Sequence, residues 1–219
     1  MNKSLKHYST LGVILAALCS MAQTGLAGPA EPGLKITLRI YDYAHVEPET
    51  LIRAEQEVTR IYSKIGVETV WVDQPLLTEK EQKDSSREQT FDIGLSIPAS
   101  GMAERLGAST NTLGLALGTG PNRDWAYVFY DRVENLARKQ TAAVVERKVR
   151  RRATKAQILG YAMAHEVGHL LGLSHSSNGI MRDGWRWNDL LDAAYRDLDF
   201  TPEEAALIRI RVEMRSREH

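Results

Sequence analysis

The segment from Tyr161 to Met181, YAMAHEVGHLLGLSHSSNGIM, is the most informative part of this sequence, because it contains an HExxHxxGxxH motif. Residues four apart lie on the same face of an α-helix, so His165 and His169 can both point at one metal ion. Gly172 can adopt the left-handed conformation that ends a helix. The chain can then turn sharply, and His175 can reach the same ion from outside the helix.

Three imidazole ligands leave the fourth position of a tetrahedral zinc ion open, which is typical of catalytic rather than structural zinc sites. Glu166 follows the first ligand and is offset from it around the helix, so we expect it to contact the metal-bound water. Zinc lowers the pKa of that water, and Glu166 can accept its proton and pass it to a departing amine. The motif therefore predicts one catalytic Zn²⁺ held by His165, His169 and His175, with Glu166 as the general base.

The motif is specific. A lone histidine such as His45 is more often a hydrogen-bonded residue than a metal ligand, but three of the six histidines of this chain lie in one 11-residue window. At average amino-acid usage, the five fixed residues of the motif should match by chance on the order of once in 100,000 chains of this length. A core helix with merely hydrogen-bonded histidines is therefore a poor explanation.

The segment resembles the metzincin zinc metallopeptidases, and His175-Ser176 is most similar to their matrixin branch. Met181, six residues after His175, is similar to the methionine that turns beneath the zinc in that family. Gly179, two residues before Met181, stands where that family often has a serine. The resemblance implies an α/β (α+β) fold: a twisted, mostly parallel sheet with an antiparallel edge strand, an active-site helix and a small C-terminal lobe.

The residues before the motif alternate between strand and helix patterns. Period-two alternation of apolar residues and β-formers predicts strands, and apolar residues at helical spacing predict helices. A strand, a helix and a second strand in succession imply a right-handed crossover and a parallel pair. The expected strands are residues 34–43, 67–72, 91–97, 112–118 and 125–130, and the expected helices are residues 48–65, a helix from about residue 134, the helix carrying the motif, and one from residue 202 to about 215.

Residues 112–118 (TLGLALG) form a short glycine-bearing strand of the kind found at sheet edges. The resemblance places this strand over the cleft, where its unpaired backbone groups could bind an extended peptide as an added strand. Trp185 and Trp187 either line a side-chain pocket or pack within the small lobe. Thr201 is a good helix cap, with Pro202 in the first turn.

The first 27 residues are typical of an export signal: a basic start, an apolar run from Leu11 to Leu18 and small residues before a cleavage site after Ala27, or alternatively after Ala22. The apolar run is far shorter than the roughly 20 residues that span a bilayer, which disfavours a retained anchor. Cleavage would remove Cys19, the only cysteine, so the mature chain could form no disulfide and could not cover its zinc with a cysteine. We expect a signal peptide at 1–27 and a catalytic domain at 28–219, with lobes of about 28–172 and 173–219.

Composition limits the partners. The 219 residues are 43% hydrophobic and 26% charged, and the 28 basic residues balance the 28 acidic ones, which argues against nucleic acid or anionic lipid as a partner. The basic stretch from Arg147 to Lys155 could grip a polyanion. A solvated helix face is the better explanation, because no aromatic residues are interleaved with it.

These observations predict a secreted or periplasmic zinc metalloendopeptidase that hydrolyses peptide bonds, with no integral membrane segment in the mature chain. One alternative is a non-catalytic zinc-holding module that binds peptides, although binding alone does not need Glu166. Another is a zinc amidohydrolase acting on a small or non-peptide amide. Structural calcium and the oligomeric state stay open.

Overall fold

The computed structural model describes residues 33–73, 92–117, 125–147 and 151–217. The expected signal peptide lies outside the described residues, as does part of the basic stretch. The same holds for residues 78–90, a polar run without periodicity for which the sequence predicts a solvated surface loop. Within the described residues, no helix combines the length and the apolarity that crossing a bilayer requires.

The centre of the fold is a five-stranded mixed sheet with the strand order β2-β1-β3-β5-β4. Strand β1 pairs in parallel with β2 and β3, and β3 pairs in parallel with β5, whereas β4 is antiparallel to β5. This sheet confirms the predicted fold class, including the antiparallel edge strand. The strands are β1 (Leu34–Asp42), β2 (Val67–Asp73), β3 (Asp92–Ile97), β4 (Gly114–Ala116) and β5 (Trp125–Val128).

The alternation predicted for the first strand separates the two faces of the sheet. Ile36, Leu38 and Ile40 of β1 are buried in the main hydrophobic core. Arg39 points to the opposite face and forms an ion pair with Asp92 at the start of β3. Side chains alternate along a strand, so one strand can supply both a core surface and a polar tie to its neighbour.

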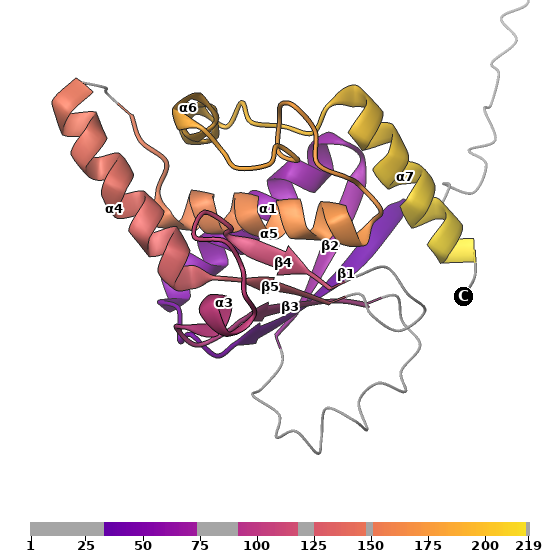
Figure 1. Cartoon of the computed structure of the whole chain (residues 1–219). Helices are drawn as coiled ribbons and strands as arrows, with labels where there is room; N and C mark the ends of the chain where they lie inside the picture. Colours follow the sequence, from indigo (N-terminus) through magenta and orange to yellow (C-terminus); the bar gives the residue numbers. More distant parts are fainter. Residues whose placement is uncertain (1–32, 74–91, 118–124, 148–150, 218–219) are drawn as a thin grey trace, which may run out of the picture. The chain divides into compact units, whose positions relative to one another are not determined.

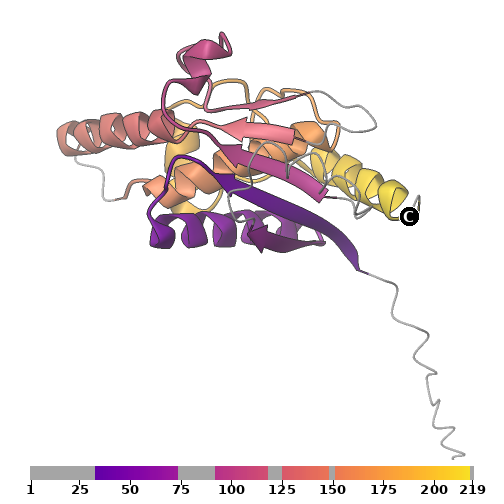
Figure 2. The ribbon, with the colours of Figure 1, turned by 90° about the horizontal axis from the view of Figure 1, so that it is seen from below.

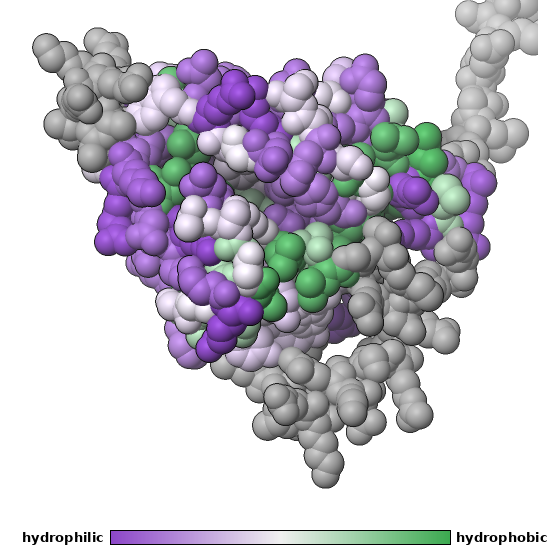
Figure 3. Space-filling model, in the orientation of Figure 1, coloured by the Kyte–Doolittle hydropathy of each residue, from purple (hydrophilic) through white to green (hydrophobic). Residues whose placement is uncertain are grey.

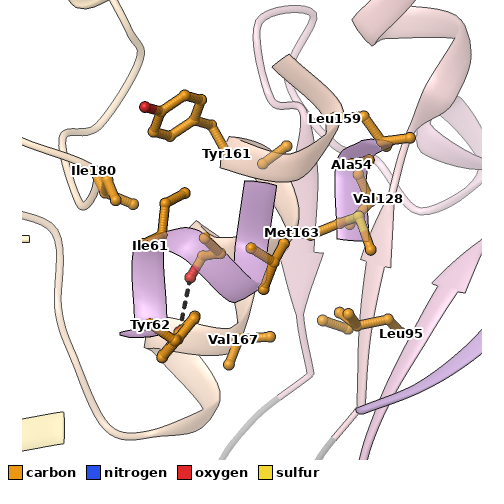
Figure 4. Close-up of a cluster of buried hydrophobic side chains, with 14 of the residues drawn as sticks. Ala54, Ile61, Tyr62, Leu95, Val128, Leu159, Tyr161, Met163, Val167 and Ile180 are labelled. Carbon is orange, nitrogen blue, oxygen red and sulfur yellow. Dashed lines mark hydrogen bonds between the residues drawn. The ribbon is translucent and has the colours of Figure 1, made fainter. Parts of the chain in front are cut away.

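Helices α1 (Pro48–Lys64) and α5 (Lys155–Leu170) pack against each other and against strands of the sheet (Figures 1 and 2). Their backbones approach closely at Gly160, where a Cβ atom would lie 2.7 Å from the carbonyl oxygen of Ala54. The Tyr62 hydroxyl donates a hydrogen bond of 3.1 Å to the Ala164 carbonyl within the apolar cluster of Figure 4. This packing holds α5 in place, and α5 carries the motif.

Several element boundaries differ from the sequence-based expectation. Helix α4 (Tyr130–Arg147) begins earlier than residue 134, because the Val133 N–H already donates to the Phe129 carbonyl as in a helical turn. Strand β5 ends correspondingly early. The edge strand β4 is shorter than residues 112–118, and the short helix α3 (Met102–Arg105) lies in the connection that precedes it.

The chain after α5 contains α6 (Trp187–Tyr195) and α7 (Pro202–Arg217). Thr201 caps α7 as predicted, because its hydroxyl accepts a hydrogen bond from the Glu204 N–H. Helix α7 returns to contact β1, and the Arg215 guanidinium donates to the carbonyl of Leu170 at the end of α5. The division into two lobes stays a prediction.

Candidate metal centre

Helix α5 is held on several sides, which leaves little freedom to the histidines that it carries. Thr154 and Gln157 form a reciprocal capping box at its N-terminus. Most of its residues are buried, including Met163 and Val167 in the core. His165 and His169 lie one turn apart and are only partly buried. The helix thus presents two imidazoles to the surface from an otherwise enclosed position.

The third histidine arrives through a tight turn. Gly172 has a φ of +90°, in the left-handed region that glycine adopts without strain. The Leu173 N–H donates to the Gly168 carbonyl at 3.0 Å and closes the turn. As a result, the Nε2 atom of His169 lies 3.0 Å from that of His165 and 3.2 Å from that of His175. The structure therefore brings the three predicted ligands together.

The hydrogen bonds of two of these rings show which nitrogen faces the centre. His165 Nδ1 lies 2.7 Å from the Ile180 carbonyl oxygen, and His169 Nδ1 lies 2.9 Å from that of Leu173. A carbonyl can only accept, so each Nδ1 carries the hydrogen and each Nε2 keeps its lone pair. Lone pairs that face one another at about 3 Å repel unless a cation lies between them.

The residues present fit a zinc ion. Zinc–nitrogen bonds of 2.0–2.1 Å in a tetrahedron place neighbouring ligand nitrogens about 3.3 Å apart, close to the separations found here. Burial lowers the pKa of His165 to about 4 and also lowers the pKa of His169. Both imidazoles are therefore neutral near physiological pH, which is the form that binds a metal. His165, His169 and His175 form a group that can hold one metal ion.

Residues that follow His175 form a closed loop that packs against α5. The Ser176 N–H donates to the Met181 carbonyl at 2.9 Å, which closes the loop between them. Met181 is fully buried, and its sulfur lies against Gly168, where a Cβ atom would be 2.6 Å away. A larger residue at position 168 would displace the Met181 side chain.

The two tryptophans have different positions. The indole N–H of Trp185 donates to the Ile180 carbonyl at 3.1 Å. The Trp185 ring packs edge-on against the His165 ring, with the two ring centres 6.2 Å apart. Trp185 also lines the cavity in front of the histidines. Trp187 is the first residue of α6 and does not line that cavity. Of the two, Trp185 therefore both lines the cavity and supports a candidate ligand.

Glu166 lies against the edge strand. Its side chain is only 5% exposed, and its carboxylate accepts a hydrogen bond from the Ala116 N–H of β4. A Cβ atom at Gly114 would lie 2.5 Å from both Cγ and Oε1 of Glu166, so only glycine leaves space for this carboxyl group. Burial raises the pKa of Glu166 to about 8.

Among the residues that the structure describes, strand β4 pairs with β5 along one edge and with no strand along the other. The Phe129 N–H donates to the Leu113 carbonyl, and the Leu117 N–H donates to the Trp125 carbonyl. Hydrogen-bonded and non-bonded pairs alternate in an antiparallel ladder, so the backbone groups of Gly114 and Ala116 point away from β5. The Ala116 N–H is the one that reaches the Glu166 carboxyl group.

These features enclose a cavity of about 880 Å³. Figure 3 shows apolar surface gathered around β4, with hydrophilic residues around it. The cavity is lined by the three histidines, Glu166, residues 109–116, residues 182–185 and several side chains of α4, among them Arg132, Asn135 and Lys139. Its size suits a short stretch of peptide or a comparable ligand.

Several residues of the site were not found from the sequence. Gly168 occupies an unspecified position of the motif, and only its contact with Met181 shows why it is small. Residues 112–118 were assigned to an edge strand, but their contact with Glu166 depends on the packing of β4 against α5. Arg132 carries no sequence signal, because a single arginine on a helix is most often a solvated residue.

Comparison with known proteins gives only distant similarity. No family model matches the chain, and no curated protein matches its sequence. The solved structure of archaemetzincin from Methanopyrus kandleri is similar at 17% sequence identity and a TM-score of 0.44, over 84% of this chain and 99% of archaemetzincin. Metalloproteinase-II from Bacteroides fragilis is similar at 14% identity and a TM-score of 0.47, over 84% of this chain and 55% of that protein.

Proposed function

We propose that this protein is an exported zinc metallopeptidase of the metzincin type, in which His165, His169 and His175 hold one zinc ion and Glu166 is the general base. One observation carries the proposal. Three imidazole Nε2 atoms converge within one cavity that also contains a buried carboxyl group and the free edge of a strand. A site that only stored a metal would need neither the carboxyl group nor the strand.

A bound zinc ion supplies Lewis acidity, which lowers the pKa of a coordinated water and polarises a carbonyl group. Peptide hydrolysis also removes a proton from the attacking water and needs one at the departing amine nitrogen. Glu166 is placed to carry this proton, because its buried carboxyl group lies in the cavity that the three histidines line. The Ala116 N–H orients the carboxylate, and the carbonyls of Ile180 and Leu173 orient two of the imidazoles.

The substrate is proposed to be an extended peptide that adds to the free edge of β4. Main-chain pairing of this kind gives affinity without demanding a particular side chain. The Ala116 N–H is already bonded to Glu166, so we expect the peptide to pair with the Gly114 N–H and with the carbonyl groups of Gly114 and Ala116. A peptide at this edge lies beside Glu166.

Two finer assignments belong to the same proposal. Placement in the matrixin branch is supported by His175-Ser176, and membership of the wider family is supported by the buried Met181 six residues after His175. Export is supported by the signal-like composition of residues 1–27. N-terminal sequencing of protein recovered from the periplasm or medium should begin at Gly28, whereas an intact Met1 on the exported chain would contradict cleavage after Ala27.

The decisive experiment is incubation of purified, zinc-loaded protein with a diverse peptide mixture, followed by mass spectrometry of the products. We expect one zinc ion per chain and new peptide termini. His169→Ala is the control variant: it should lose most of the zinc and all detectable cleavage. Full zinc content in His169→Ala would contradict the metal assignment, and a zinc-loaded wild type that cuts nothing would favour a peptide-binding module.

A further inference from the structure

We propose that Arg132 is a positioning residue for hydrolysis, which acts by holding β4 beside Glu166. The inference rests on the proposed function and deepens it. Arg132 lies at the start of α4, and its side chain is nearly buried, with only 7% of the residue exposed. Burying a guanidinium group is costly unless its hydrogen bonds are satisfied. The identity of its partners therefore shows what this residue is for.

All of these partners belong to the segment that leads into β4. One terminal nitrogen donates to the carbonyl oxygens of Thr112, at 2.8 Å, and of Ser109. The other donates to the Ala108 carbonyl at 3.2 Å and to the Glu104 carboxylate at 3.1 Å. Four residues of this connection are thus tied to one side chain.

A second contact joins Arg132 to β4 from the other direction. Its guanidinium lies over the ring of Phe129, 5.3 Å from the ring centre. The Phe129 N–H donates at 2.8 Å to the carbonyl of Leu113, the residue just before β4. Arg132 therefore holds Leu113 through Phe129 and holds Thr112 directly.

This arrangement places Arg132 at the head of a short chain of contacts that ends at Glu166. Arg132 holds residues 112 and 113, these residues set the position of β4, and β4 contacts Glu166 through Gly114 and Ala116. Strand β4 has only three residues and, within the described part of the chain, pairs with β5 alone, so its own pairing leaves it weakly held. Misplacing a catalytic group by about 1 Å can cost roughly 100-fold in rate.

The planar fork of arginine is what this role requires. Lysine would keep the positive charge, but its single ammonium group cannot reach acceptors on four residues from both ends of a rigid fork. A charge that served only to attract substrate would be largely retained by lysine. The two substitutions Arg132→Lys and Arg132→Met therefore separate positioning from charge.

The experiment measures kcat/KM on a peptide substrate, zinc content and amide hydrogen exchange of the metal-free protein. We expect both Arg132→Lys and Arg132→Met to lower kcat/KM by at least about tenfold, with one zinc per chain retained. The amides of Leu117 and Phe129, which join β4 to β5, should exchange at least about tenfold faster. Exchange within α5 should stay as in the wild type.

Arg39→Met is the matched control, because it removes a partly buried arginine from an ion pair with Asp92 outside the cavity. It should lower thermal stability without changing kcat/KM or the exchange of the β4 amides. Wild-type kcat/KM and wild-type exchange in folded Arg132→Met would overturn the inference, and so would equal losses in Arg39→Met. If Arg132→Met does not fold, Arg132→Lys decides the same comparison.

Failure of the proposed function gives a different result. A wild type that binds zinc but cleaves no peptide would remove the proposed activity. The exchange rates of Leu117 and Phe129 would still show whether Arg132 holds β4. Unchanged exchange together with reduced cleavage would mean that Arg132 acts on the substrate itself and not through the strand.

Discussion

The two sides of the cleft are built in different ways. The metal side consists of α5 and the loop to Met181, and its contacts join residues close together in the sequence, such as the hydrogen bond from His169 to the Leu173 carbonyl. The strand side consists of β4, which is held by β5, by Arg132 of α4 and by its contact with Glu166. Local geometry defines the first side, and long-range packing defines the second.

Glu166 is the point at which the two sides meet. It belongs to the motif on α5, but its carboxyl group is seated by Gly114 and Ala116 of the strand. The comparison teaches that metal binding and turnover should be separable. Changes on the strand side should leave zinc in place and reduce hydrolysis.

The largest expected effect is at the meeting point itself. Glu166→Ala should retain zinc and fold while hydrolysis falls by at least about 100-fold, the usual scale for loss of a general base. Metal analysis and peptide cleavage measured on the same sample test this. Equal cleavage by wild type and Glu166→Ala would deny Glu166 its role.

The next effect separates the two edges of β4. Ala116→Pro removes an N–H that points to the cavity and binds Glu166, so we expect cleavage to fall by some tens of fold with the melting temperature within a few degrees. Leu115→Pro removes an N–H from the paired edge, where Leu115 faces Tyr127, and should mainly lower the melting temperature. Undiminished cleavage by Ala116→Pro would mean that the hydrogen bond from the Ala116 N–H to Glu166 is not needed for turnover.

A smaller effect is expected at Gly114. In Gly114→Ala the new Cβ atom would overlap the Glu166 side chain, so the carboxyl group must shift. We expect about a tenfold loss of kcat/KM with full zinc content. Gly33→Ala is the control, because a Cβ atom there meets nothing within 4 Å. Wild-type kinetics in Gly114→Ala would show that the packing of the Glu166 carboxyl group against Gly114 is not important for turnover.

The smallest effect is a pH dependence of the metal-free protein. The native state keeps the Glu166 proton up to a pKa of about 8, whereas the unfolded chain loses it near the ordinary value of 4.5. Stability from this group is therefore complete below about pH 4.5 and is lost as the pH rises towards 8. Glu166→Gln has no such proton to lose.

Thermal unfolding of the two metal-free proteins measures this difference. The melting temperature of Glu166→Gln should rise relative to wild type between pH 5 and pH 8. His165 is present in both proteins, so the effect of its own depressed pKa cancels in the comparison. A difference that does not change with pH would mean that Glu166 is not buried as the structure places it.

The metal side could be predicted almost completely from the sequence. The spacing of His165 and His169 needs only a helix, and the return of His175 needs only a residue that can adopt a positive φ, which Gly172 supplies. The strand side could be predicted only in outline. The pattern of residues 112–118 indicates an edge strand, but a pattern carries no register, so it could not show that Ala116 faces Glu166 while Leu115 faces β5.

By itself, the sequence predicted that His165, His169 and His175 come together with Glu166 beside them, and it predicted the mixed sheet, because each depends on the period of a helix or a strand or on a turn a few residues long. Only the tertiary structure decided that Gly114 seats Glu166, that Gly168 makes room for Met181 and that Arg132 holds the approach to β4. These contacts join different elements of the fold. The partners in these contacts depend on how α4, α5 and the sheet pack together. No regular spacing in the sequence predicts that packing.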